Sequence, residues 1–129
     1  MLTIYSYYFE EYLFKFSFEA EEGAGAPPWL DSDAFPPLSP RQAIDASKNA
    51  VAEMLKAYPW ADPQFSACAL KRTTESEGGW WYYDVEWMVW PPECDGGDRS
   101  GINVPVMLNG RVPSFEVFKY QDRFKAWES

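Results

Sequence analysis

The sequence predicts an α+β fold in which one long helix packs on a four- to five-stranded antiparallel sheet. Three observations support this prediction. Residues 40–57 carry apolar side chains at helical spacing, most other apolar stretches alternate with a period of two, and turn signals separate them. The expected order is strand, helix and then four strands, and a chain of 129 residues suits a single domain.

The first extended region, residues 3–19, contains a change of face. Aromatic side chains occupy odd positions up to Phe9 and even positions from Tyr12 onward. Because a slip of one residue moves every side chain to the other face of a strand, this change predicts a bulge or a break near Glu10 and Glu11. The second aromatic set alternates with polar residues, as in a half-buried strand: Lys15, Ser17 and Glu19.

Residues 20–38 are rich in glycine, proline and acidic residues, which predicts a long loop. Loops of this length are uncommon inside compact domains and are often functional or mobile. Large apolar side chains within it are expected to anchor it to the body of the protein, because buried aromatic rings contribute strongly to packing: Trp29, Leu30 and Phe35.

The helix has recognisable start and stop signals. Ser39 is a natural N-cap, Pro40 suits the first helical position, and Gln42 completes a capping box. Pro59 ends the helix, because the residue before a proline disfavours helical geometry. The helix is therefore expected over residues 40–57. One face carries its apolar and small side chains: Ala43, Ile44, Ser47, Ala50, Val51, Met54, Leu55 and Tyr58.

Four strands are expected after the helix, at residues 65–74, 80–90, 102–108 and 111–120. The dipeptide Asn109-Gly110 is the strongest short hairpin signal, so the last two strands are predicted to pair with each other. The predicted register pairs Leu108 with Arg111, Val106 with Pro113, Val104 with Phe115 and Ile102 with Val117. Prolines 105 and 113 cannot donate to a ladder, which places one of these strands at an edge or gives it a bulge. Residues 121–129 are expected to form a polar tail, which Phe124 and Trp127 could dock.

The two faces of the strand at 80–90 differ in composition. Its odd positions are all apolar or aromatic, and we expect them to form the core under the helix: Trp81, Tyr83, Val85, Trp87 and Val89. Its even positions mix aromatic and acidic side chains and form the candidate binding face: Trp80, Tyr82, Asp84, Glu86, Met88 and Trp90. Either this second face is an ordinary sheet surface covered in part by the loop or the tail, or it meets a partner, because Tyr, Trp and Met are enriched at interfaces.

The helix opening "LSPRQAIDAS" and the turn at Asn109-Gly110-Arg111-Val112 give residues 38–117 a pattern that resembles the cystatin-like fold and the small PepSY-type modules. The resemblance implies one helix packed on an antiparallel sheet. Cystatin inhibitors carry a Gln-x-Val-x-Gly hairpin loop, whereas the first hairpin tip here reads "ESEGGW". Protease inhibition of the cystatin kind is therefore not expected, and because a fold hosts many functions, the resemblance concerns the fold alone.

Composition excludes several kinds of chemistry. A net charge of −9 without a basic stripe argues against nucleic-acid binding, and the absence of histidine removes Ser-His-Asp catalysis, Cys-His catalysis and histidine-ligated metals. No phosphate-binding glycine loop occurs. Cys68 is expected to be a small buried residue, and the two cysteines, Cys68 and Cys94, are too few for a disulfide scaffold. No signal peptide or bilayer-spanning run is recognisable, so we expect a cytoplasmic protein that needs no cofactor.

Two groups of carboxylates remain as candidate sites. Asp84 and Glu86 stand two positions apart on one strand face, a spacing loosely compatible with the carboxyl pair of a glycosidase. A polar, solvent-facing side of a sheet explains them more simply. The run "ECDGGD" at residues 93–98 is oxygen-rich, but its spacing matches no EF-hand, so a solvated turn is expected and no metal site is predicted.

Together these observations predict a small, acidic, non-catalytic binding protein. The acidic excess favours a basic protein or peptide partner, met through the even face of the strand at 80–90, as in a toxin-neutralising immunity protein. A module for a small ligand such as a sugar or a cation, and a homo-oligomer whose interface is that face, remain as alternatives. A carboxylate-pair hydrolase is the least favoured.

Overall fold

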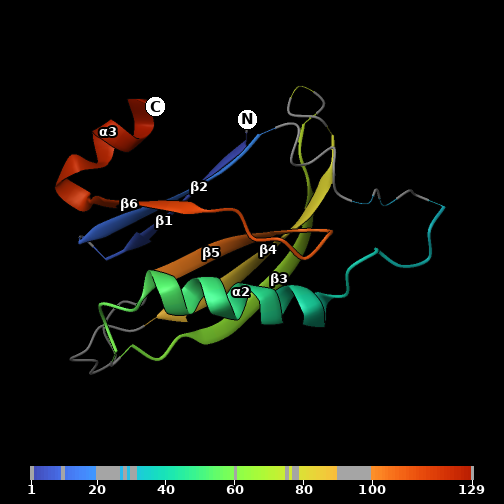
Figure 1. The fold of residues 1–129 in the computed structure, drawn as a ribbon, viewed down its shortest axis with the longest axis horizontal. Coiled ribbons are helices and arrows are strands. Elements are labelled where there is room, and N and C mark those ends of the chain that lie inside the picture. Colours follow the sequence, from blue (N-terminus) through green and yellow to red (C-terminus); the bar gives the residue numbers. More distant parts are fainter. Residues whose placement is uncertain are drawn as a thin grey trace.

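The computed structural model describes residues 2–9, 11–19, 27, 29, 32–59, 61–74, 76, 79–89 and 100–128. Six strands and two α-helices lie within these ranges (Figure 1). Their bounds are β1 (Leu2–Tyr8), β2 (Tyr12–Phe18), α2 (Pro40–Met54), β3 (Gln64–Arg72), β4 (Trp81–Val89), β5 (Ser100–Met107), β6 (Phe115–Lys119) and α3 (Arg123–Glu128), with a short 3-10 helix, η2 (Tyr120–Asp122), before α3.

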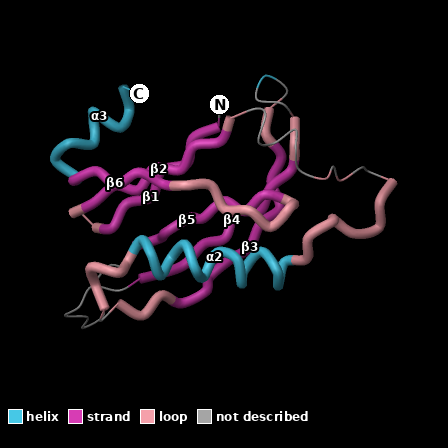
Figure 2. Tube along the Cα trace, in the orientation of Figure 1, coloured by secondary structure: helices cyan, strands magenta, loops and turns pink. Residues whose placement is uncertain are grey.

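The strands form two antiparallel sheets of three strands each, in the orders β1-β2-β6 and β3-β4-β5. The predicted α+β class is confirmed, but the predicted single sheet of four to five strands is wrong. Figure 2 shows α2 beside the β3-β4-β5 sheet. The β1-β2-β6 sheet lies beyond β5, on the side opposite β3 (Figure 2). The difference begins at the N-terminus, where the extended region supplies two strands instead of one.

The change of face near Glu10 and Glu11 marks a hairpin turn. Tyr8 pairs with Tyr12, and the Glu11 amide donates to the Tyr8 carbonyl at 3.2 Å. Phe9 takes a φ of 52°, a left-handed conformation that is uncommon for a residue with a side chain and that tight turns require. The expected break is therefore confirmed, and its form is a full reversal of the chain.

The predicted hairpin between the last two strands is wrong, because β6 pairs with β2 and not with β5. A tight turn does form: Gly110 donates to the Met107 carbonyl at 2.8 Å, and Met107 donates to the Arg111 carbonyl at 2.9 Å. Because Met107 bonds to Arg111, the loop covers three residues instead of the predicted two, and the register shifts by one. Gly110 takes a φ of 85° in this loop. The chain then leaves β5, whose far edge is already occupied by β1.

The two sheets meet where β1 lies beside β5. The Ser6 hydroxyl accepts a hydrogen bond from the Asn103 amide at 2.8 Å and donates to the Asn103 carbonyl at 3.3 Å. Ser100 donates to the Tyr7 carbonyl at 2.5 Å and accepts from the Phe9 amide at 3.2 Å. The Ser6 hydroxyl thus satisfies backbone groups of β5, and the Ser100 hydroxyl satisfies backbone groups of the first hairpin. Pro105 lies in the edge strand β5, which confirms the position expected of a strand that carries proline.

The helix α2 begins as the sequence predicts. Ser39 accepts from the Gln42 amide at 3.2 Å, and the Gln42 side chain accepts from the Ser39 amide at 2.9 Å, which completes the capping box. The helix ends at Met54, three residues earlier than the expected range of 40–57. The chain tightens there, because Tyr58 donates its amide to the Leu55 carbonyl at 2.8 Å.

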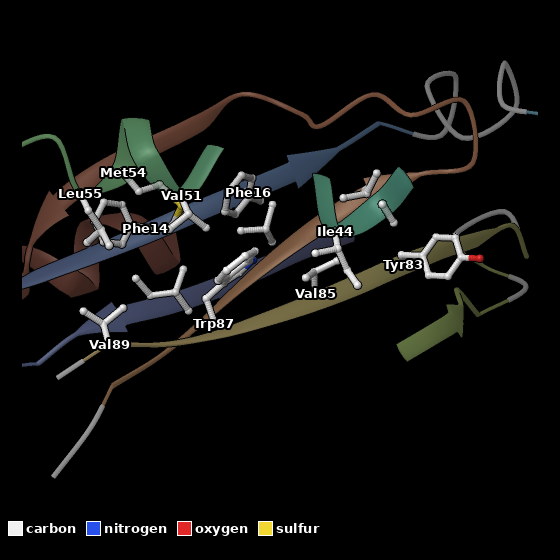
Figure 3. Packing of buried hydrophobic residues seen from close by; sticks show 14 of the residues in the cluster. Phe14, Phe16, Ile44, Val51, Met54, Leu55, Tyr83, Val85, Trp87 and Val89 are labelled. Carbon is white, nitrogen blue, oxygen red and sulfur yellow. The ribbon is translucent and has the colours of Figure 1, made fainter. Parts of the chain in front are cut away.

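The core lies between α2 and the facing surfaces of both sheets (Figure 3). The odd positions of β4 are buried as expected: Tyr83, Val85, Trp87 and Val89, with Trp81 half-buried. Sheet β1-β2-β6 contributes Phe14 and Phe16 to the same cluster. The Trp87 indole donates to the buried Ser47 hydroxyl at 2.9 Å, so each of these two buried polar groups has a partner.

The C-terminal segment and the loop depart from their expected roles in part. Residues of the expected polar tail form α3, yet Phe124 and Trp127 remain 56% and 47% exposed, so they do not dock it. Instead, the buried Lys15 ammonium donates to the Ala126 carbonyl at 3.0 Å beneath α3. In the loop, Trp29 packs on Trp81 with ring centres 4.9 Å apart, whereas Phe35 is exposed. Leu30 lies outside the described residues.

Candidate functional site

The aromatic half of the predicted binding face is covered by β2. Phe18 is buried, and its ring centre lies 5.3 Å from that of Trp80 and 6.0 Å from that of Tyr82. Tyr82 is buried and Trp80 is half-buried. The cover therefore comes from the sheet β1-β2-β6, a source that the sequence pattern did not suggest.

Asp84 is buried on the same face, and both of its carboxylate oxygens have partners. Lys71 donates to Oδ2 at 2.7 Å and the Asn103 side chain donates to Oδ1 at 3.0 Å. The hydrogen bond between Lys71 and Asp84 raises the pKa of the Lys71 ammonium, while partial burial opposes the rise. A carboxylate held in this way suits a structural ion pair better than proton transfer to a substrate.

Glu86 and Met88, like Trp80, are half-buried members of the predicted face. One Glu86 carboxylate oxygen accepts from the Ser66 hydroxyl at 3.0 Å. Trp90 lies outside the described residues, as does the acidic run at 93–98. The structure thus brings Trp80, Tyr82, Asp84, Glu86 and Met88 onto one face, on which Tyr82 and Asp84 are buried and the other three are half-buried.

A different surface emerges beside α2, where two neighbouring cavities share Glu53 and Phe115. The first has a volume of about 560 Å³ and lies between α2 and the segment from Gly110 to Phe115. The second has a volume of about 270 Å³ and lies between the end of α2, β2 and β6. We call the combined surface the α2–β6 groove. Its apolar walls include Ala46, Ala50, Met54, Ala57, Tyr12, Phe14, Val112, Phe115 and Val117.

Within the part of the chain that the structure describes, β6 has a strand partner only on its β2 side, and its open edge borders this groove. Tyr120 donates to the Glu11 carbonyl at 2.8 Å, and this bond shows which alternate residues of β6 form backbone hydrogen bonds to β2. In an antiparallel pair the backbone groups of alternate residues point toward and away from the partner strand. Phe118 therefore bonds to β2, whereas the N–H and C=O groups of Phe115, Val117 and Lys119 point away from it. Val117 is also 52% exposed.

Tyr58 closes one end of the groove. Its hydroxyl donates to the Glu11 carboxylate at 2.8 Å, and its ring packs on Tyr8 with ring centres 4.4 Å apart. Burial, followed by the hydrogen bond to Glu11, raises the pKa of Tyr58. The phenol therefore stays protonated at neutral pH and holds the first hairpin against the end of α2.

A further cavity of about 510 Å³ lies on the other side of α2, against Trp87 and the segment from Tyr58 to Pro63. Lys48 and Lys56 line it, and each forms an exposed ion pair with a residue of α2, Lys48 with Asp45 at 3.5 Å and Lys56 with Glu53 at 3.4 Å. None of these three cavities is lined by Asp84 or Glu86. Within the described ranges, no group of histidine, cysteine and acidic residues is placed to hold a metal ion.

Comparisons with family models, curated proteins and solved structures find no match to this chain. The resemblance to cystatin-like and PepSY-type modules therefore stays a prediction. No helix in the part of the chain that the structure describes has the length and apolar character needed to cross a membrane. The α2–β6 groove could not be found from the sequence, because the predicted hairpin assigned the edge of β6 to β5.

Proposed function

We propose that the protein is a non-catalytic binding protein whose partner is a basic protein or peptide. The observation that carries this proposal is the coincidence of an open strand edge with an apolar groove. An extended segment that adds to a sheet edge gains main-chain hydrogen bonds, and pockets for alternate side chains give it specificity. The α2–β6 groove offers both features beside β6.

The geometry of β6 defines the bound segment. Backbone groups of Phe115, Val117 and Lys119 point toward the added strand, so a proline at a pairing position of the partner is excluded. Side chains at every second position of that strand face the groove, where the 270 Å³ cavity accepts an apolar group. The partner is thus an extended segment in which apolar residues alternate with others.

Charge favours a basic segment. The chain carries a net charge of −9, which attracts cationic partners and speeds their encounter. Glu53 lines both cavities of the groove, with its side chain 65% exposed. Its ion pair with Lys56 is exposed and therefore weak, so a basic partner side chain can compete for the carboxylate at little cost. The predicted aromatic face supports this role less well, because Tyr82 and Asp84 are buried.

Selection from a displayed library of random peptides on the immobilised full chain tests the proposal. Enriched peptides are expected to be basic, free of proline and alternately apolar. Val117→Pro removes one outward N–H, whereas the matched Val117→Ala keeps it and removes only side-chain bulk. Relative to Val117→Ala, Val117→Pro should weaken binding by about tenfold, the value of one hydrogen bond. Equal binding by the two variants, or no enrichment at all, would exclude strand addition in this groove.

A further inference from the structure

Among the described residues, β3 is another strand with a partner on one side only, and it lies at the margin of its sheet, away from β1 and β2 (Figure 1). Thr73 donates to the Trp80 carbonyl at 3.0 Å, which fixes the phase of the β3–β4 ladder. Backbone groups of Ala67, Ala69 and Lys71 therefore bond to β4. Those of Cys68, Leu70 and Arg72 point away from it.

Both faces of β3 are also open. The helix α2 packs mainly on β4 and β5, which leaves Phe65 47% exposed and Cys68 and Leu70 half-buried on the helix side. On the opposite face, Ala67 and Ala69 are exposed. The stretch from Phe65 to Leu70 contains no charge and no proline. Natural proteins usually protect a long edge strand with charges, prolines or bulges. In β3 a bulge lies between Phe65 and Ala67 and the charges begin at Lys71, so the segment from Ala67 to Leu70 is the unprotected part of this edge.

We propose that β3 pairs with β3 of a second copy of the chain, in an antiparallel arrangement that joins the two sheets across a two-fold axis. The favoured register places Ala69 opposite the partner's Ala69. Cys68 of each copy then forms a hydrogen-bonded pair with the partner's Leu70, so the outward backbone groups and the half-buried apolar side chains of the two copies meet. This inference is independent of the proposed function, which uses the edge of β6.

Charge complementarity supports a second copy as the occupant. In this register Lys71 lies opposite the partner's Ala67, and Ala67 pairs with Glu86 within each sheet. The partner's Glu86 lies two strands from Lys71, about 10 Å between backbones, and the small alanine between them leaves room for the half-exposed lysine side chain to turn from Asp84 toward the partner's Glu86. The two Lys71 residues are four positions out of register, about 13 Å apart along the strands. Their repulsion is screened, because the Debye length is about 8 Å at physiological salt.

Cysteine cross-linking of the full chain tests the register. In a background of Cys68→Ser and Cys94→Ser, Ala69→Cys is expected to form a dimeric disulfide under diamide. The directly opposed pair at the axis does not exchange hydrogen bonds, so its Cα atoms are about 4.5 Å apart, within disulfide range. The matched variant Ala67→Cys is also at an exposed position, but its partner cysteine lies about 13 Å away and should not cross-link. Equal cross-linking of both variants, or of neither, overturns the register.

Light scattering coupled to size exclusion tests the association itself. The unmodified chain is expected to pass from monomer to dimer as its concentration rises through the micromolar range. Ala69→Lys places two lysines at the axis and should abolish the dimer, whereas Ala52→Lys, the same charge change at an exposed site on α2, should leave it intact. A chain that stays monomeric throughout, or a dimer that both variants disrupt equally, overturns the proposal. So does a monomeric chain that captures a different protein through β3.

Discussion

Ser6 joins the two sheets with one hydroxyl that both accepts and donates. Asn103 lies on the edge strand β5, so its amide and carbonyl have no strand partner on that side. The Ser6 side chain satisfies both groups and is itself 3% exposed. A small polar residue at this position therefore replaces a ladder of backbone hydrogen bonds at the point where the sheets meet.

Ser6→Ala is expected to lower the free energy of unfolding by about 1–3 kcal/mol, because it leaves the amide and carbonyl of the half-buried Asn103 without their partner. Urea denaturation followed by tryptophan fluorescence measures the change. Ser17→Ala is a matched control on the neighbouring strand, since the Ser17 hydroxyl forms no hydrogen bond to the other described residues, and it should alter stability by less than about 0.5 kcal/mol. Equal losses in the two variants would contradict the role of Ser6.

At the scale of elements, local signals predicted local structure well. The capping box at Ser39 and the alternation along β4 depend on neighbours in the sequence, and the structure confirms both. Strand partners depend on which edges are free in three dimensions. The pairing of β6 with β2 could not be predicted, because nothing in the sequence shows that β1 lies along the edge of β5.

The same distinction governs the candidate site. The even positions of β4 were correctly separated from the core set, since a strand has two faces. The cover that Phe18 places over Trp80 and Tyr82 was missed, because it joins strands that are far apart in sequence. Lys15 was expected among the alternating polar residues, yet it is buried beneath α3, where the Ala126 carbonyl compensates its charge in part.

At the scale of the whole molecule, the resolved pKa shifts of the described residues all point upward. Burial is the main cause for Tyr8, Tyr58, Cys68 and Tyr83, and the hydrogen bond to Asp84 is the main cause for Lys71. A group whose pKa is raised by folding holds its proton more tightly in the folded chain. Its contribution to stability is complete below the unfolded pKa and is lost as the pH rises through the folded pKa.

The free energy of unfolding is therefore expected to fall from about pH 9 upward, where cysteine, tyrosine and lysine begin to titrate in the unfolded chain. Urea denaturation at a series of alkaline pH values measures this decline. High salt screens the general repulsion of an acidic chain but not the effect of burial, so the decline should persist there. Tyr8→Phe removes one buried phenol and should make the decline shallower. A stability that stays constant or rises with pH would contradict this account.

The central claim is that the edge of β6 is open in the free chain and pairs with the partner segment. Residue-resolved amide hydrogen exchange, with and without the strongest selected peptide, tests it most directly. In the free chain we predict slow exchange at Phe118, which bonds to β2, and fast exchange at Val117 and Lys119. Bound peptide should protect Val117 while leaving Phe118 nearly unchanged. Protection of Val117 in the free chain, or its continued fast exchange in the complex, would contradict the claim.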